Sequence, residues 1–580
     1  MPTLNWIGKE AVVRHHKDVP FRLLEPVTEL SCGDNHGKDS GNLIVQGDNL
    51  HALKALLPRY AGKVKCIYID PPYNTGNEAW KYNDNVNSPE IRKWLGEVVG
   101  KEGETLDRHD RWLSMMYPRL LLLKKFLRDD GLIFVSIDDN EQQSLRWLMD
   151  EIFQKDNFVA QFVWNTEGHT DNQFHVKVNH EYVVCYALNS DKATFGHVVD
   201  PNTREGSNLW AGFAENSITK NGPANPPSEI ELPVGFPISV ESIDLPPSEV
   251  PDGLIRAMVD EGLSSNPLKR RFGKIQFPLR LGRMVGSKGA LIEPCRVFSG
   301  WANANKLRRF IDNDCKPFED DGSQMRFYLS ESGVIYYRRE RGDKARNILS
   351  VLRGFSTTEK MRAELERMNL HFSYPKPKEL IKYLVKVGSE AGDIVLDSFA
   401  GSGTTGQAVM ELSSEGEVRN FILVEISKDT ARDITRTRLK KVSDGYIDSA
   451  GEYIAGLGGG FQFCQLSTEP LFDASGQIRS DVKFAQLAEF VWFAETGTGF
   501  TGTADSPLLG IHEGRAIYLL YNGILKDKSV GGGNVLTGPV FDVLPKFSGQ
   551  KVIYAAANRM GARAAREDIT FKQTPYALEV

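Results

Sequence analysis

The chain has 580 residues and a net charge of −6, with 41% hydrophobic and 25% charged residues. This composition excludes a mostly disordered chain, and the length predicts several domains. No apolar run reaches the roughly 18–20 residues of a membrane helix, and the first residues lack a secretory signal. The 6 cysteines form no Cys-x-x-Cys pair, which argues against a zinc knuckle or a disulfide framework. We therefore expect a cytoplasmic protein with no membrane segment and no metal.

Apolar runs alternate with helical patterns in two separate parts of the chain. In the first part, strands are expected at 43–45, 64–69 and 132–137, and helices at 49–60, 109–128 and 141–153. The pattern stops near residue 160 and returns near residue 372. The second part predicts a helix at 378–388, a strand at 393–399, a glycine-rich turn, a helix at 407–414 and a strand ending at Glu425. This alternation predicts an α/β fold with a mostly parallel sheet.

The stretch between the two parts has a different character. Residues 222–252 are rich in proline and predict an extended loop. Residues 265–310 carry many basic side chains and a single acid, Glu293. In an acidic chain such a run indicates contact with a phosphate backbone, although a solvated basic face has the same pattern. The candidate DNA-binding residues are Arg270, Arg271, Lys274, Arg280, Arg308 and Arg309.

Beyond about residue 445 the sequence is broken by glycines and rich in apolar runs. Strands are expected at 456–463, 489–495, 516–522 and 551–557. This tail predicts a separate C-terminal domain of mixed structure.

The glycine-rich turn permits three interpretations. Gly401, Gly403 and Gly406 match the G-x-G-x-x-G fingerprint of dinucleotide-binding enzymes, such as a nicotinamide-dependent dehydrogenase. They could also serve only for tight packing. However, Asp397 precedes the glycines, and a carboxylate there would repel a diphosphate. It would suit an ammonium or sulfonium group, and S-adenosylmethionine carries both, with ribose hydroxyls for Glu425.

The second motif is Asp70-Pro71-Pro72-Tyr73, which follows a predicted strand. The prolines have no N–H group, so the turn presents the Asp70 carboxylate and the Pro71 carbonyl as acceptors beside an aromatic ring. These groups suit a planar ring with an exocyclic amino group, on which Tyr73 would stack. The pattern therefore predicts transfer of a methyl group to that amino nitrogen.

Together these motifs resemble the β class of DNA amino-methyltransferases. Asp-Pro-Pro-Tyr precedes Phe399-Ala400-Gly401-Ser402-Gly403, which is the permuted order of that class. The segments Gly47–Leu50, Ser136–Glu141, His180–Val183 and Tyr374–Pro377 further resemble the modification subunit of Type III restriction-modification systems. The resemblance implies a Rossmann-like methyltransferase sheet with an inserted target-recognition domain, adenine N6 as acceptor, and a base flipped out of double-stranded DNA.

The resemblance also assigns roles to individual residues. Asp70 and Pro71 would hold the target amino group, with Pro72 completing the turn and Tyr73 stacking on the base. The cofactor residues would be Asp48, Lys376, Asp397, Phe399, Gly401, Gly403, Thr404 and Glu425. A homodimer and a separate helicase-nuclease restriction subunit are the implied partners.

The expected domains are the two methyltransferase halves at 1–164 and 356–445, the inserted recognition domain at 165–355 and the C-terminal domain at 446–580. Three alternatives share part of this evidence. They are a solitary methyltransferase without a nuclease partner, a cytosine-N4 enzyme on the same scaffold, and a non-enzymatic DNA-binding module.

Overall fold

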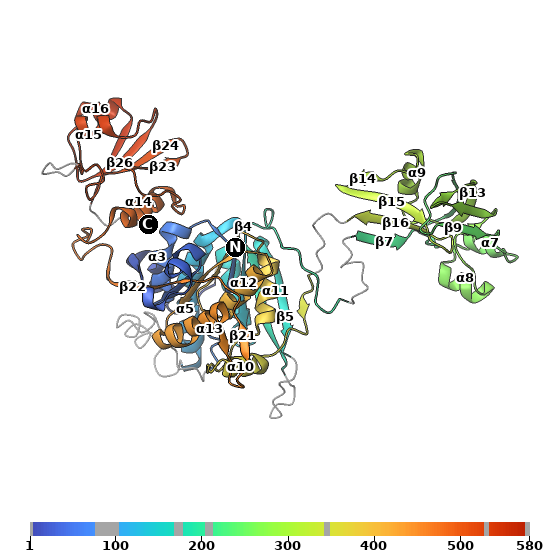
Figure 1. The fold of residues 1–580 in the computed structure, drawn as a ribbon, viewed down its shortest axis with the longest axis horizontal. Coiled ribbons are helices and arrows are strands. Elements are labelled where there is room, and N and C mark those ends of the chain that lie inside the picture. Colours follow the sequence, from blue (N-terminus) through green and yellow to red (C-terminus); the bar gives the residue numbers. More distant parts are fainter. Residues whose placement is uncertain are drawn as a thin grey trace. The chain divides into compact units, whose positions relative to one another are not determined.

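In a computed structural model the chain forms two compact units (Figure 1). One unit consists of Met1–Gly196 and Leu349–Val580, and the other of His197–Ile348. The structure describes residues 4–75, 104–166, 178–203, 213–340, 348–526 and 533–574. The second unit lies within the predicted insert of 165–355, whose part in target recognition stays a prediction.

A ten-stranded sheet forms the centre of the first unit. Its strands, in spatial order, are β1 (Arg22–Pro26), β22 (Gln462–Pro470), β2 (Leu43–Gln46), β19 (Asn420–Glu425), β18 (Ile394–Asp397), β3 (Val64–Ile69), β4 (Leu127–Ile137), β6 (His180–Ala187), β5 (Phe158–Asn165) and β17 (Val351–Leu352). The strands from β22 to β4 run parallel, and β6 runs antiparallel to β4 and β5. The predicted α/β fold is confirmed, because β18 and β19 from the second part of the chain lie between β2 and β3.

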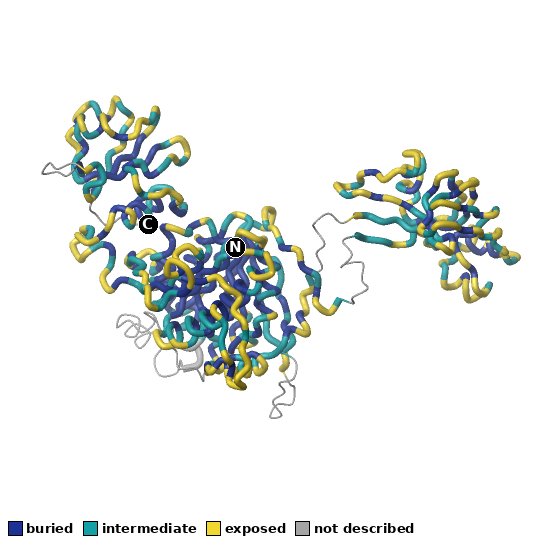
Figure 2. Tube along the Cα trace, viewed as in Figure 1, coloured by how far each residue is buried: buried dark blue, intermediate teal, exposed yellow. Residues whose placement is uncertain are grey.

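Most residues of the interior parallel strands β2, β3, β18 and β19 are hydrophobic, because both faces of the sheet are covered. Every residue of β3 is buried, and Figure 2 shows the buried core along the sheet. The helices of this unit include α3 (Asn49–Tyr60), α5 (Glu104–Phe126), α6 (Gln142–Phe153), α10 (Thr358–Arg367), α11 (Lys378–Gly388), α12 (Thr404–Ser414), α13 (Arg436–Asp444) and α14 (Phe484–Thr496). The helices predicted at 49–60 and 378–388 are confirmed with the same bounds.

Two predictions about local structure are wrong. The strand predicted at 489–495 is part of α14, whose residues Phe490 to Phe493 are all buried. A short apolar run is equally typical of a strand and of a buried helix, and α14 packs against α3. Residues 129–131, predicted to separate helix from strand, lie inside β4.

The segment 446–580 contributes to two sheets. β22 is an interior strand of the central sheet, between β1 and β2. The remainder forms a four-stranded sheet of β23 (Leu508–His512), β24 (Arg515–Leu519), β26 (Lys551–Ala555) and β28 (Ile569–Gln573). β24 and β26 confirm the strands predicted near 516 and 551.

The second unit is built from small antiparallel sheets around a core that includes Phe236, Phe310 and Phe327. Its larger strands are β7 (Phe213–Ser217), β8 (Pro227–Leu232), β9 (Ser242–Leu245), β11 (Met284–Ser287), β13 (Cys295–Gly300), β15 (Ser323–Leu329) and β16 (Ile335–Glu340). The loop predicted at 222–252 is therefore partly wrong, because it contains β8 and β9. The basic run supplies α8 (Ser265–Phe272) and α9 (Ala304–Asp312), which lie at opposite ends of the unit in Figure 1.

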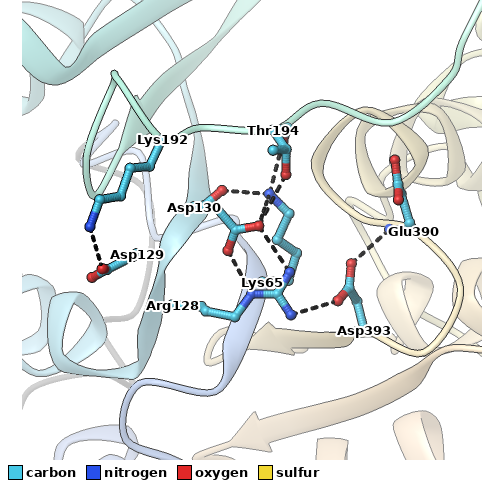
Figure 3. A network of polar contacts seen from close by, with 8 residues as sticks. All are labelled: Lys65, Arg128, Asp129, Asp130, Lys192, Thr194, Glu390 and Asp393. Carbon is cyan, nitrogen blue, oxygen red and sulfur yellow. Dashed lines mark hydrogen bonds and ion pairs between the residues drawn. The ribbon is translucent and has the colours of Figure 1, made fainter. Parts of the chain in front are cut away.

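A polar network joins the two parts of the central sheet at the amino ends of its strands (Figure 3). The buried Lys65 ammonium lies 3.4 Å from Asp130 Oδ2 and donates to the Thr194 carbonyl at 2.8 Å. Arg128 donates to Asp130 Oδ1 at 2.6 Å and to Asp393 Oδ1 at 3.0 Å. The Arg128 hydrogen bond holds the pKa of Asp130 far below its usual range.

Asp130→Asn is expected to lower the free energy of unfolding by roughly 2–3 kcal/mol, because it removes the carboxylate partner of a buried ammonium. Asp129→Asn is the matched control, since Asp129 and its partner Lys192 are both exposed, and a loss below about 0.5 kcal/mol is expected. Urea unfolding of both variants measures the difference. The Asp130 contribution should decline progressively as the pH falls below about 4, where the unfolded carboxylate takes up its proton, because the folded carboxylate stays ionised to a much lower pH. Equal losses in the two variants would contradict this.

Candidate active site

Two motifs far apart in sequence meet at the carboxyl ends of neighbouring strands. β18 runs parallel to β3 with Leu396 opposite Ile67. Asp70 and Phe399 each follow three residues later, so they come level at the same edge of the sheet. In open α/β sheets this edge is where ligands bind. The Asp-Pro-Pro-Tyr turn and the glycine-rich turn therefore border one site.

A hydrogen bond from a buried tryptophan fixes the Asp-Pro-Pro-Tyr turn, and one of the turn's acceptor atoms has no donor among the described residues. The indole N–H of the buried Trp112 donates to the Pro72 carbonyl at 2.7 Å. Asp70 Oδ1 is buried and has no hydrogen-bond partner among the residues that the structure describes. A buried carboxylate oxygen without a donor is costly, so this atom is suited to a donor supplied by a ligand.

Four side chains meet at this turn. The Lys376 ammonium lies 3.0 Å from Asp70 Oδ2 and 3.4 Å from Glu181 Oε2. The Tyr73 hydroxyl donates to the same Glu181 oxygen at 3.0 Å. Burial lowers the pKa of Lys376, but the charges of Asp70 and Glu181 outweigh burial and raise the pKa above its usual value. Lys376 is thus a permanent cation beside Asp70, and its assignment to the cofactor stays a prediction.

The glycine-rich turn needs residues that adopt left-handed backbone angles. Gly401 and Gly403 have φ of 50° and 81°. A Cβ atom on Gly403 would lie 3.0 Å from the Thr435 methyl, and the Thr435 hydroxyl donates to the Gly401 carbonyl at 2.6 Å. The close contact explains why only glycine fits, and the turn leads directly into α12.

Asp397 faces the inside of this turn. Its Oδ1 accepts the Phe399 N–H at 2.9 Å, and its Oδ2 accepts the Thr405 hydroxyl at 2.6 Å. Burial raises the pKa of Asp397 to about 7, so its charge is only partial near neutral pH. The electrostatic argument against a diphosphate is correspondingly weaker, and a cofactor contact of Asp397 stays a prediction.

Glu425 and Asp48 lie at the ends of adjacent strands beside the glycine-rich turn. Glu425 ends β19 and accepts the Gly401 N–H at 2.9 Å. Gln46, opposite Glu425, ends β2, and Asp48 then caps α3 by accepting the His51 N–H at 3.0 Å. Two carboxylates beside a tight backbone turn suit the hydroxyl groups of a nucleoside.

Thr404 and a buried arginine connect the glycine-rich turn to Lys376. The Thr404 hydroxyl donates to the Lys376 carbonyl at 3.3 Å. Arg438 on α13 donates to the Thr404 and Ser402 hydroxyl oxygens, each at 2.9 Å. It is fully buried, and burial lowers its pKa to about 10. Arg438 could not be predicted from the sequence, because nothing in its local sequence distinguishes it from other basic residues of α13.

Glu181 and a polar cluster behind the Asp-Pro-Pro-Tyr turn were also not predicted. Asn74 donates to Glu141, and His109 Nδ1 donates to the same Glu141 oxygen at 2.6 Å. Asn74 directly follows Tyr73, so the buried Glu141 carboxylate holds the end of the turn. The Ser136–Glu141 and His180–Val183 segments were the available signals for Glu141 and Glu181.

The predicted DNA-binding residues do not form one continuous run in space. Arg270 and Arg271 lie on α8, and Arg308 and Arg309 lie on α9, at the other end of the unit (Figure 1). These four and Lys274 are exposed, whereas Arg280 is half-buried. Acids outside the run pair with several of its basic residues, in the pairs Arg271–Glu261, Arg283–Asp244, Arg296–Glu229 and Lys306–Asp320. The local positive charge is therefore smaller than the sequence suggests.

Within the described ranges, no three side chains of His, Cys, Asp or Glu are arranged to hold a metal ion. Helices in the same ranges are all too short or too polar to cross a membrane.

Comparisons with known proteins identify the family of the chain. Residues 64–436, well over half of the chain, match the DNA methylase family model N6_N4_Mtase. The EcoPI Mod subunit of a Type III restriction-modification enzyme from Escherichia phage P1 is 31% identical over 73% of this chain and 63% of its own length. The StyLTI Mod subunit of Salmonella typhimurium is 29% identical over 76% and 62%. The Type II methyltransferase M.KpnI of Klebsiella pneumoniae is 26% identical over 69% and 88%.

The chain thus spans less than two thirds of the two Mod subunits that it matches. The family match itself includes both the Asp-Pro-Pro-Tyr turn and the glycine-rich turn, which β3 and β18 bring to one edge of the sheet. The chain belongs to the N6_N4 DNA methylase family.

Proposed function

We propose that the protein is a site-specific DNA methyltransferase that methylates N6 of adenine in double-stranded DNA, with S-adenosylmethionine as the methyl donor. The observation that carries the proposal is the geometry of Asp70. Its buried Oδ1 has no hydrogen-bond donor among the described residues, and it lies at the strand end that borders the glycine-rich turn. An exocyclic amino group is a donor of the right kind for this atom.

The donor set beside the glycine-rich turn fits S-adenosylmethionine. Glu425 and Asp48 would accept hydrogen bonds from the ribose, and Phe399, Gly401, Gly403 and Thr404 would line the nucleoside and the methionine part. When bound, the sulfonium group supplies an electrophilic methyl group. Gly403 is required by the packing of the turn itself, because a side chain there would meet Thr435.

The target base would be held by the catalytic turn. Asp70 Oδ1 and the Pro71 carbonyl would accept the two amino hydrogens, and Tyr73 would stack on the ring. Removing an adenine from the duplex costs a few kcal/mol, which stacking and contacts to the DNA backbone offset. The resemblance to the β class of DNA amino-methyltransferases implies adenine N6 rather than cytosine N4 for a turn that begins with aspartate.

DNA contacts of the second unit would contribute to that offset. Arg270, Lys274 and Arg308 are exposed and have no ion pair with the residues described, so they are the best candidates for phosphate contacts. The basic residues that form ion pairs with acids are less available for phosphate contacts.

The relatives support two biological settings. The identities to the EcoPI and StyLTI Mod subunits favour the modification subunit of a Type III restriction-modification system. For that setting the proposed assembly is a homodimer with a separate helicase-nuclease partner. The chain covers 88% of M.KpnI, however, which favours a methyltransferase acting alone as the second candidate.

Sequencing of modified bases in a methylation-free host tests the proposal. Expression of the wild-type protein should place N6-methyladenine in one short DNA motif, and expression of Asp70→Ala should not. Methylation of one strand of an asymmetric motif would favour the Type III setting. Detection of N4-methylcytosine would show that cytosine, not adenine, is the target base. The proposal would be refuted if no modified base is found and the purified protein fails to bind S-adenosylmethionine.

A further inference from the structure

Glu181 stands out as a site carboxylate to which no role has been assigned. It lies near the start of β6, where it pairs with Trp164 of β5. Because β6 runs antiparallel to β4, its first residues reach the carboxyl edge of the parallel strands. A single carboxylate oxygen, Oε2, lies 3.0 Å from the Tyr73 hydroxyl and 3.4 Å from the Lys376 ammonium.

A second anion is needed at this site because Lys376 is positively charged and lies against Asp70. Lys376 lies 3.0 Å from Asp70 Oδ2, and its ammonium lies 4.7 Å from the centre of the Tyr73 ring. Its side chain is only 10% exposed, so water provides little alternative solvation. With Asp70 as the sole anion, the lysine charge would neutralise the carboxylate that must attract the target amino group. Glu181 is a second anion beside Lys376. The lysine charge is therefore shared between two carboxylates and neutralises Asp70 less.

The Tyr73 hydroxyl also needs a hydrogen-bond partner. A tyrosine hydroxyl that is removed from water needs an acceptor. Glu181 is the acceptor that the structure gives it. The hydrogen bond fixes one edge of the ring. Lys376 lies over one face of the ring, so a stacked base would use the opposite face.

We propose that Glu181 is a positioning residue for methyl transfer. It holds Lys376 on Asp70 Oδ2, so that Oδ1 stays directed toward the target amino group, and it fixes the Tyr73 ring. This inference rests on the proposed methyltransferase function. Glu181 acts through Lys376 and Tyr73 and needs no contact with the base or the cofactor.

Glu181→Gln tests the proposal in the full-length protein, with tritiated S-adenosylmethionine and plasmid DNA from a methylation-free host. We expect kcat to fall 10–100-fold, with the Kd for S-adenosylmethionine within about twofold of wild type. Glu181→Asp should recover part of the loss. The matched control is His180→Gln, because His180 contacts Tyr182 and should leave kcat within about twofold.

A second measurement separates positioning from a general loss of structure. If Glu181 acts partly through the Tyr73 hydroxyl, Glu181→Gln should cost clearly less in a Tyr73→Phe background than in the wild type. Equal costs in both backgrounds, or a wild-type kcat for a folded Glu181→Gln protein, would overturn the inference. Absence of methyl transfer by the wild-type protein would instead refute the proposed function.

Discussion

Replacing Asp70 by asparagine is expected to slow methyl transfer by roughly 100–1000-fold, the usual loss when one preorganised electrostatic contact is removed from an active site. The physical reason lies in Lys376, which is 3.0 Å from Oδ2. The asparagine amide must turn its oxygen toward this cation. Its NH2 group then takes the place of Oδ1, where the target amino group also brings a donor. Two donors would face each other, so the variant loses an attraction and gains a repulsion.

Single-turnover transfer of a tritiated methyl group measures this loss, together with the Kd for S-adenosylmethionine, which should change less than about twofold. Asp139→Asn is the matched control. Asp139 follows the neighbouring strand β4, is exposed and accepts the Tyr182 hydroxyl at 2.9 Å. It should retain activity within about threefold. A rate for Asp70→Asn within tenfold of wild type would contradict the assigned role of Oδ1.

The free energy of unfolding of Asp397→Asn is expected to increase relative to that of the wild type as the pH rises. The pKa of Asp397 is raised to about 7 by burial, whereas an unfolded aspartate has a pKa near 4. The folded state therefore binds this proton more tightly than the unfolded state. Between pH 4 and pH 7 the wild type loses stability progressively, by up to about 4 kcal/mol, because the buried carboxylate must ionise. An asparagine has no such dependence.

Urea unfolding of wild type and Asp397→Asn at pH 5 and pH 8 measures the effect as a change in their difference. The variant should gain about 2–3 kcal/mol relative to wild type between these two pH values. Thr405→Val removes the hydroxyl that donates to Asp397 but keeps the carboxylate. Because the Thr405 hydrogen bond lowers the pKa of Asp397, this variant should keep a pH dependence of the same sign and extend it to higher pH. A difference between wild type and Asp397→Asn that is independent of pH would show that Asp397 stays ionised in the fold.

Features of the site that depend on local sequence could be predicted. Gly47 and Asp48 end a strand and cap a helix within a few residues, and α3 begins where the pattern places it. The prolines and glycines of the two catalytic motifs restrict their own backbone, so both turns are readable from the sequence. The parallel order of strands then follows from the alternation of strands and helices.

Features that depend on distant partners could not be predicted. Glu181 contacts Lys376 only because an antiparallel strand arrives beside the catalytic turn, and no spacing in the sequence indicates this. The positive charge of residues 265–310 was overestimated for the same reason, since acids such as Asp244 and Glu229 on other strands pair with its arginines. For α14, four consecutive apolar residues allow either a strand or a buried helix, and only its packing decides.

The position of β22 in the central sheet has a consequence for synthesis of the protein. A chain leaving the ribosome presents β1 and β2 long before β22, which must later enter between them. Until Gln462–Pro470 has been translated, both strands carry an unpaired edge. A premature stop codon after residue 445 would leave both catalytic motifs in the nascent chain and still remove an interior strand. Such a truncated product should be recognised by chaperones and proteases rather than act on DNA.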